Sequence, residues 1–125
     1  MNWNGLANSD KIILDLCGGT GAWSKPYRDN GYDVRLITLP EYDVRNYNPP
    51  DNVYGILAAP PCTEFSRARQ KNRYMVEAPK RNLEAGLEIV NHCLRIISVA
   101  HPCWWALENP VGLLRQFLGK PIFTF

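Results

Sequence analysis

The sequence lacks paired cysteines, long apolar runs and a large excess of charge of either sign. Its four cysteines form no CxxC pair, so a zinc site is disfavoured, and disulfides are not expected inside the cell. No apolar run approaches the ~20 residues of a membrane-spanning helix. The opening residues, MNWNGLANSD, lack the basic head and apolar core of a signal peptide. We therefore expect a cytoplasmic protein with no membrane partner.

The composition fits one globular domain. The chain has 125 residues, of which 46% are hydrophobic, so it is long enough to bury a core and too short for a large two-domain enzyme. Fourteen Lys and Arg stand against twelve Asp and Glu, a net charge of +2. That charge is too small to indicate a polyanionic partner by itself.

Short apolar segments alternate with helical ones along the chain. The pattern predicts strands at 11–16, 33–39, 53–59 and 103–107, and a very short one at 42–44. It predicts helices at about 22–30, 80–100 and 111–118, and the start of a further strand at 121–125. The helix at 80–100 is the clearest, because one apolar stripe follows its helical period. The alternation predicts an α/β fold: a doubly wound, mostly parallel sheet with helices on both faces.

Three of the predicted strands end in chemically unusual residues. The segments are DLCGGTG (15–21), APPC (59–62) and ALENP (106–110). Because the carboxyl ends of parallel strands meet at one edge of a sheet, we expect all three segments at the same rim. Ligands of open α/β sheets bind at this rim, beside the point where the strand order reverses.

The first segment is a glycine-rich turn after a buried strand. Its glycines, Gly18, Gly19 and Gly21, would let the backbone turn sharply and approach a ligand closely. A tight strand-to-helix turn without any ligand explains the same pattern. A phosphate-binding P-loop is disfavoured, because no Gly-Lys-Ser or Gly-Lys-Thr follows.

The second segment holds a cysteine directly after two prolines. Pro60 and Pro61 stiffen the chain and would hold Cys62 at a fixed place beyond the strand, as a nucleophile requires. The alternative is a buried cysteine that acts as a small apolar side chain. A position just after a Pro-Pro strand exit is rarely in the core, so we favour the nucleophile.

The third segment places a carboxylate at the end of a strand. Glu108 follows an apolar strand that contains Trp104 and Trp105, so we expect it to be partly desolvated and able to hold or donate a proton. A helix start, with Asn109 as the cap and Pro110 in the first turn, explains the same residues. Both interpretations can hold together.

In this order, DLCGGTG, PPCTEFS and LENPVGLL resemble the DNA cytosine-5 methyltransferases over about residues 11–118. The glutamate motif reads ENP, as in the phage-type members. Adenine and N4-cytosine methyltransferases carry an aromatic residue where Cys62 stands. The resemblance implies S-adenosylmethionine as cofactor, a cytosine flipped out of DNA as substrate, and the Rossmann-like sheet of methyltransferases.

The resemblance also implies a role for individual residues. Cys62 matches the nucleophile that attacks C6 of cytosine, and Glu108 matches the carboxyl that engages N3 and the exocyclic amine; Asn109 belongs to the same catalytic motif. Asp43 matches the acidic residue that binds the adenine amine of the cofactor. The remaining cofactor-binding matches are Asp15, Cys17, Gly18, Gly19, Gly21 and Pro60.

Two residues depart from the family pattern. Cys17 stands where the family usually has a phenylalanine near the cofactor, and Thr38 stands where an acidic residue normally grips the ribose hydroxyls. Glu41 is a candidate substitute for that acidic residue. Both departures predict weaker cofactor binding.

Positive charge is concentrated just after Cys62. Residues 64–81 hold six Lys or Arg against two Glu, a net charge of +4, whereas the rest of the chain carries −2. Because Lys and Arg contacts to phosphate supply most non-specific DNA affinity, we expect this segment to contact the DNA backbone. An ordinary solvated loop is the alternative. The candidate DNA-binding residues are Ser66, Arg67, Arg69, Lys71 and Arg73.

The length leaves more than one functional hypothesis open. We expect residues 1–125 to form a single, partial catalytic domain, because family members continue with further strands and a target-recognition region. A remnant that binds cofactor or DNA without chemistry is therefore the second hypothesis, and a second chain or another copy of this one is a candidate partner. An RNA-directed cytosine methyltransferase is disfavoured, because those enzymes usually have a second cysteine where Glu108 stands.

Overall fold

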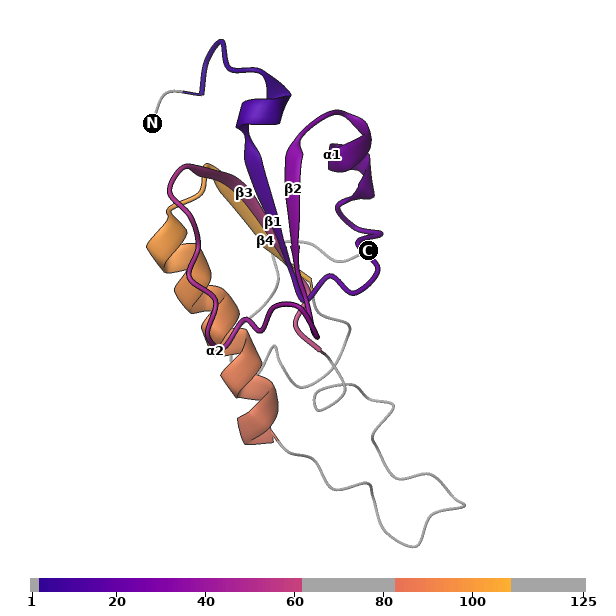
Figure 1. Cartoon of the computed structure of the whole chain (residues 1–125). Helices are drawn as coiled ribbons and strands as arrows, with labels where there is room; N and C mark the ends of the chain where they lie inside the picture. Colours follow the sequence, from indigo (N-terminus) through magenta and orange to yellow (C-terminus); the bar gives the residue numbers. More distant parts are fainter. Residues whose placement is uncertain (1–2, 62–82, 109–125) are drawn as a thin grey trace, which may run out of the picture.

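A four-stranded parallel sheet forms the centre of the protein (Figure 1). The structure is a computed structural model that describes residues 3–61 and 83–108. The strands are β1 (Ile12–Leu16), β2 (Asp33–Ile37), β3 (Val53–Ala58) and β4 (Trp104–Leu107), in the order β2-β1-β3-β4. The other elements are the 3-10 helix η1 (Asn8–Asp10) and the α-helices α1 (Lys25–Asp29) and α2 (Leu83–Ala100). The expected α/β class with a parallel sheet is confirmed.

The two central strands are apolar because both of their faces are covered. In β1, residues 13–16 are all buried, and in β3 Tyr54 is the one residue that is not fully buried. Near-continuous apolar runs of this kind are typical of strands buried on both faces of a parallel sheet. The edge strand β2 alternates charged and apolar residues, as its sequence DVRLI shows, and it is correspondingly less buried.

One face of the sheet packs against α2. Leu14, Leu16 and Ile56 of the strands form a single buried cluster with Cys93 and Ile96 of the helix. The predicted apolar stripe of α2 therefore supplies the core, as its helical period indicated. The helix ends at Ala100, and His101 takes a positive φ of 48° just before Pro102.

The opposite face carries α1 (Figure 1) and a cluster of aromatic rings. Tyr27 of α1 stacks on Trp104 of β4, with ring centroids 5.4 Å apart, and Tyr54 of β3 meets the same indole edge-on. Gly55 lies opposite Trp104 in the sheet register, and a Cβ at this position would overlap the indole ring. The helices α1 and α2 thus cover opposite faces, as the sequence predicted.

Two predicted elements differ in the structure. Residues 42–44 form no strand, because the chain turns there and the Asp43 carboxylate accepts the Arg45 backbone N–H over 2.9 Å. The helix predicted at about 22–30 is shorter, Lys25–Asp29, and Ser24 at its N-cap makes no side-chain cap because its hydroxyl donates to Asp15. The elements predicted at 111–118 and 121–125 lie outside the described residues. In the ranges 3–61 and 83–108, no helix is long and apolar enough to cross a membrane.

Candidate functional site at the carboxyl ends of the strands

The ends of the strands meet at one rim, as the sequence predicted. Beyond the strands, the backbone N–H of Cys17 bonds the carbonyl of Ile37 (2.8 Å), that of Ala59 bonds Leu16 (3.0 Å), and that of Glu108 bonds Ala58 (2.8 Å). These bonds join the exits of β2, β1, β3 and β4 side by side. The chain runs from β1 to β2 on one side and then returns to β3 on the other, so the strand order reverses at β1, where such sheets bind ligands.

The glycine-rich turn directly follows β1. The N–H of Gly21 bonds the carbonyl of Gly18 over 3.0 Å, and the N–H of Gly19 donates to Thr38 Oγ1 over 3.3 Å. Thr38, the residue that departs from the family pattern, therefore ties the glycine turn to the exit of β2. Its hydroxyl stabilises the shape of the turn, a role that the sequence did not reveal.

A buried carboxylate lies under this turn. Asp15 is fully buried, and its Oδ2 accepts the Ser24 hydroxyl over 2.6 Å, whereas its Oδ1 has no hydrogen-bond partner. Burial raises the pKa of Asp15, against the lowering by Ser24 and by the charge of Arg28. Gly18 approaches so closely that a Cβ there would overlap the Asp15 carboxyl. A buried acceptor without a partner is rare in native folds and marks strain or function.

Two thiols meet behind the rim. Cys17 has a positive φ of 60° and packs against the core cluster that contains the fully buried Cys93. A hydrogen bond from Cys93 lowers the pKa of Cys17, while burial and the charges of Asp43 and Asp15 oppose this lowering. The same contact with Cys17, together with burial, raises the pKa of Cys93. Both carboxylates thus act electrostatically on the Cys17 thiol.

Asp43 lies in the turn that follows β2. Its Oδ2 accepts Nη2 of Arg45 over 2.7 Å, and its Oδ1 accepts Nε of Arg45 over 3.0 Å. This pairing lowers the pKa of Asp43 to about 2. The carboxylate is therefore ionised at neutral pH, and its side chain remains 23% exposed.

Arg95 of α2 fixes the turn that carries Asp43. Its Nη2 donates to the carbonyls of Val44 (3.0 Å) and Tyr47 (2.9 Å), and its Nε donates to His92 Nδ1 (3.3 Å). Sequence reasoning missed both Arg95 and Ser24. One sequence signal pointed to Arg95: a row of polar residues lies beside the apolar stripe of α2, namely Glu84, Glu88, His92 and Arg95. That row does not identify the partners of Arg95, which lie about fifty residues away in the chain.

The other predicted site residues divide into two groups. Pro60 is buried at the exit of β3, and Glu108 is half-buried at the exit of β4, where its backbone N–H bonds the Ala58 carbonyl. Trp104 packs in the aromatic cluster and Trp105 is 52% exposed, so the tryptophans belong to the sheet faces and not to the rim. The remaining predicted residues lie outside the described part of the chain: Cys62, Ser66, Arg67, Arg69, Lys71, Arg73 and Asn109.

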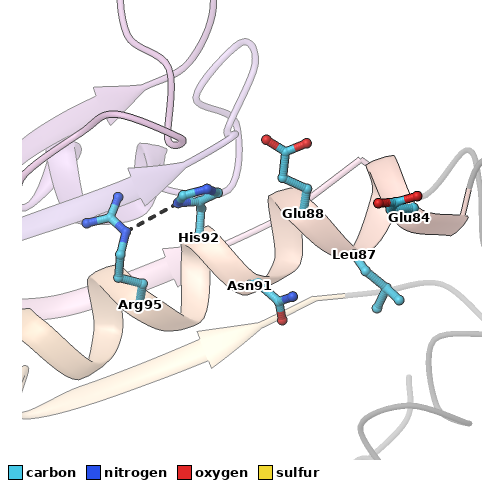
Figure 2. Close-up of a pocket in the computed structure, with 6 residues that line it drawn as sticks. All are labelled: Glu84, Leu87, Glu88, Asn91, His92 and Arg95. Atoms are coloured by element: carbon cyan, nitrogen blue, oxygen red, sulfur yellow. Dashed lines mark hydrogen bonds between the residues drawn. The ribbon is translucent and has the colours of Figure 1, made fainter.

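An open groove of about 710 Å³ runs along α2 (Figure 2). Glu88, His92 and Arg95 lie on one side of the helix, and Leu87 points away from them (Figure 2); Glu84 and Asn91 complete the lining. The groove follows the helix instead of the strand ends. Its His92–Arg95 end is connected to the rim through the bonds from Arg95 to the turn at 43–47.

Comparisons of the chain with models of protein families, with curated proteins and with solved structures find no match. The function is therefore inferred from the residues at the rim and from the motifs in the sequence.

Proposed function

We propose that this chain is a DNA cytosine-5 methyltransferase, or part of one, that uses S-adenosylmethionine and forms a covalent bond between Cys62 and its target base. The observation that carries the proposal is the junction of the three motif-bearing strand ends, fixed by the backbone bonds of Ala59 to Leu16 and of Glu108 to Ala58. The order of strands at this junction is compatible with the doubly wound sheet of S-adenosylmethionine-dependent methyltransferases.

The residues on the cofactor side of the rim fit S-adenosylmethionine. The turn at Gly18 has no side chain that would block close approach of a ligand, and Asp15 below it keeps one carboxylate oxygen unpaired. Asp43 supplies an ionised acceptor for the amine of adenine. When bound, the cofactor supplies an electrophilic methyl group.

The chemistry that we assign to the chain requires a nucleophile and a carboxyl group. The Cys62 thiolate forms a bond to C6 of the flipped cytosine, and the electron pair displaced from the C5–C6 bond makes C5 nucleophilic. Glu108 holds a proton at N3 and so offsets the charge that develops on the ring. Once C5 carries the methyl group and S-adenosylhomocysteine is left, the C5 hydrogen passes to water as a proton, the double bond re-forms and the sulfur of Cys62 departs with its electron pair.

Methyl transfer to DNA tests this proposal. Tritiated S-adenosylmethionine is incubated with the full chain and a duplex of random sequence, and with the same duplex in which 5-methylcytosine replaces cytosine. We expect label only in the first duplex, because C5 is blocked in the second. Replacement of Glu108 by Gln should lower the rate about 10²- to 10⁴-fold, the usual contribution of a general acid. Equal labelling of both duplexes would contradict the proposal.

A second candidate function is a module that binds cofactor or DNA without chemistry. Three observations reduce the groups that are free to hold the cofactor, which methyl transfer requires, and so favour a module that binds DNA or binds the cofactor only weakly: Cys17 packs against the core, the Thr38 hydroxyl accepts the Gly19 N–H, and the Asp43 carboxylate is already paired with Arg45. Calorimetric titration with S-adenosylmethionine separates the candidates. Binding without transfer of label would support the module, and no heat at millimolar cofactor would exclude cofactor binding by either candidate.

A further inference from the structure

Arg95 is the one cation of α2 that bonds the turn at residues 43–47, within the part of the chain that the structure describes. Its guanidinium is half-buried and donates to two backbone carbonyls of that turn, those of Val44 and Tyr47. A planar guanidinium bonds two carbonyls at once in a fixed geometry, which an ammonium does not reproduce. The side chain is itself oriented by His92, whose Nδ1 accepts from Nε.

The turn is held at a second point by its own side chains. Val44 is 4% exposed and belongs to the core cluster, so it anchors the turn to the sheet. Asp43 stands immediately before it, and its carboxylate oxygens are oriented by Arg45. The place of the Asp43 carboxylate at the rim is therefore set jointly by the buried Val44 side chain and by the Arg95 bond to the Val44 carbonyl.

Arg45 directs three donors at the Asp43 carboxylate: its backbone N–H (2.9 Å), its Nε (3.0 and 3.1 Å) and its Nη2 (2.7 Å). A carboxylate has about four lone-pair sites, so about one site is left for a further donor, on a side chain that remains 23% exposed. A donor from a ligand can bond the free side of the carboxylate only if the turn keeps its position. A carbonyl oxygen in place of that donor would face an ionised carboxylate and be repelled.

We propose that Arg95 is a positioning residue that sets the purine selectivity of the cofactor site. Arg95 acts through the 43–47 turn and does not itself contact the cofactor. It holds the 43–47 turn so that Asp43 accepts the exocyclic amine of adenine and rejects the carbonyl oxygen of hypoxanthine. This inference rests on the proposed function, because it requires a cofactor with an adenine base.

The test compares S-adenosylhomocysteine, whose purine carries the exocyclic amine, with S-inosylhomocysteine, whose purine carries a carbonyl oxygen in its place. Dissociation constants are measured by calorimetry for the full chain and for Arg95→Gln, Arg95→Lys and, as a control on the same helix, the exposed Glu84→Gln. For the unaltered chain we expect a preference for the adenine ligand of roughly ten- to a hundredfold, the effect of one hydrogen bond to a charged group. Arg95→Gln should remove most of this preference, Arg95→Lys should retain part of it, and Glu84→Gln should leave it unchanged.

A double-variant cycle separates positioning from general loss of stability. In the Asp43→Asn background the carboxylate is absent, so addition of Arg95→Gln should not change the ratio of the two constants further. If Arg95→Gln does not fold, the same comparison of the two ligands is made with Arg95→Lys, which retains the positive charge. A preference that survives unchanged in Arg95→Gln would overturn the inference and leave the proposed function intact. No binding, or no preference, in the unaltered chain would overturn the adenine site itself and this inference with it.

Discussion

The Ser24 hydroxyl donates a hydrogen bond of 2.6 Å to Oδ2 of Asp15, and both side chains are fully buried. This bond joins the turn before α1 to the carboxyl end of β1, directly beneath the glycine turn. The other oxygen of this carboxylate, Oδ1, has no hydrogen-bond partner in the described residues.

Removal of the Ser24 hydroxyl should destabilise the fold. In Ser24→Ala the second oxygen of a buried carboxylate loses its donor, and hydrogen bonds to charged groups contribute about 1.5–3 kcal/mol. We expect a loss of that size in the free energy of unfolding, measured in urea at neutral pH. Ser98→Ala, at an exposed position of α2, should change it by less than about 0.5 kcal/mol. Equal effects of the two substitutions would contradict the assigned role of Ser24.

Asp15 should make stability depend on pH. Burial raises its pKa in the folded state above the ordinary value of 3.8. Its favourable contribution is therefore fully present below that value and is lost as pH rises through the folded pKa. Between about pH 3.5 and pH 7, the unfolding free energy of the natural chain should fall relative to that of Asp15→Asn, which does not ionise. Urea unfolding at both pH values checks this, and a difference that rises with pH would show that the sign is wrong.

The packing of the Trp104 indole should tolerate only glycine at position 55. A methyl group at this position would overlap the six-membered ring of the indole, and overpacking of this kind costs about 1–3 kcal/mol. We expect Gly55→Ala to lower the unfolding free energy by that amount. In a Trp104→Phe background, which removes part of the ring, the cost should be smaller. An unchanged cost in the two backgrounds would mean that the ring is not the obstacle.

The cysteines should differ in reactivity. Cys103 is exposed, whereas Cys93 is fully buried and its pKa is raised by contact with Cys17 and by burial. Because the thiolate is the reactive form, iodoacetamide should modify Cys103 of the folded chain well before Cys93, as mapped by mass spectrometry. The difference should disappear in denaturant. Early modification of Cys93 in the folded chain would contradict its placement in the core.

Elements that bury apolar side chains could be predicted from the sequence. The run Ile13–Leu16 defined β1, and the period of apolar residues defined α2, because burial on the sheet selects those patterns. The predicted strand at 42–44 was wrong because Asp43 bonds its own neighbour Arg45. Local bonds of this kind compete with pairing in a sheet, and an apolar pattern does not report them.

The rim was predictable in outline and not in its supporting contacts. Parallel strands bring their carboxyl ends together, so the junction of the segments after Leu16, Ala58 and Leu107 followed from the strand pattern alone. The contacts of Ser24 and Arg95 did not, because no motif marks either residue and the partners of Arg95 lie about fifty residues away in the chain. Such contacts depend on the packing of α1 and α2 against the sheet, which only the folded structure specifies.

The most direct test of the central claim is covalent capture of the chain on DNA. A duplex of random sequence in which 5-fluorocytosine replaces cytosine is incubated with the full chain and S-adenosylmethionine; the fluorine cannot leave C5 as a proton does, so the bond to sulfur persists. We predict a complex that survives denaturing electrophoresis in the natural chain and in Cys103→Ser, and none in Cys62→Ser. A folded natural chain that binds the cofactor and the duplex but forms no such complex would contradict the account.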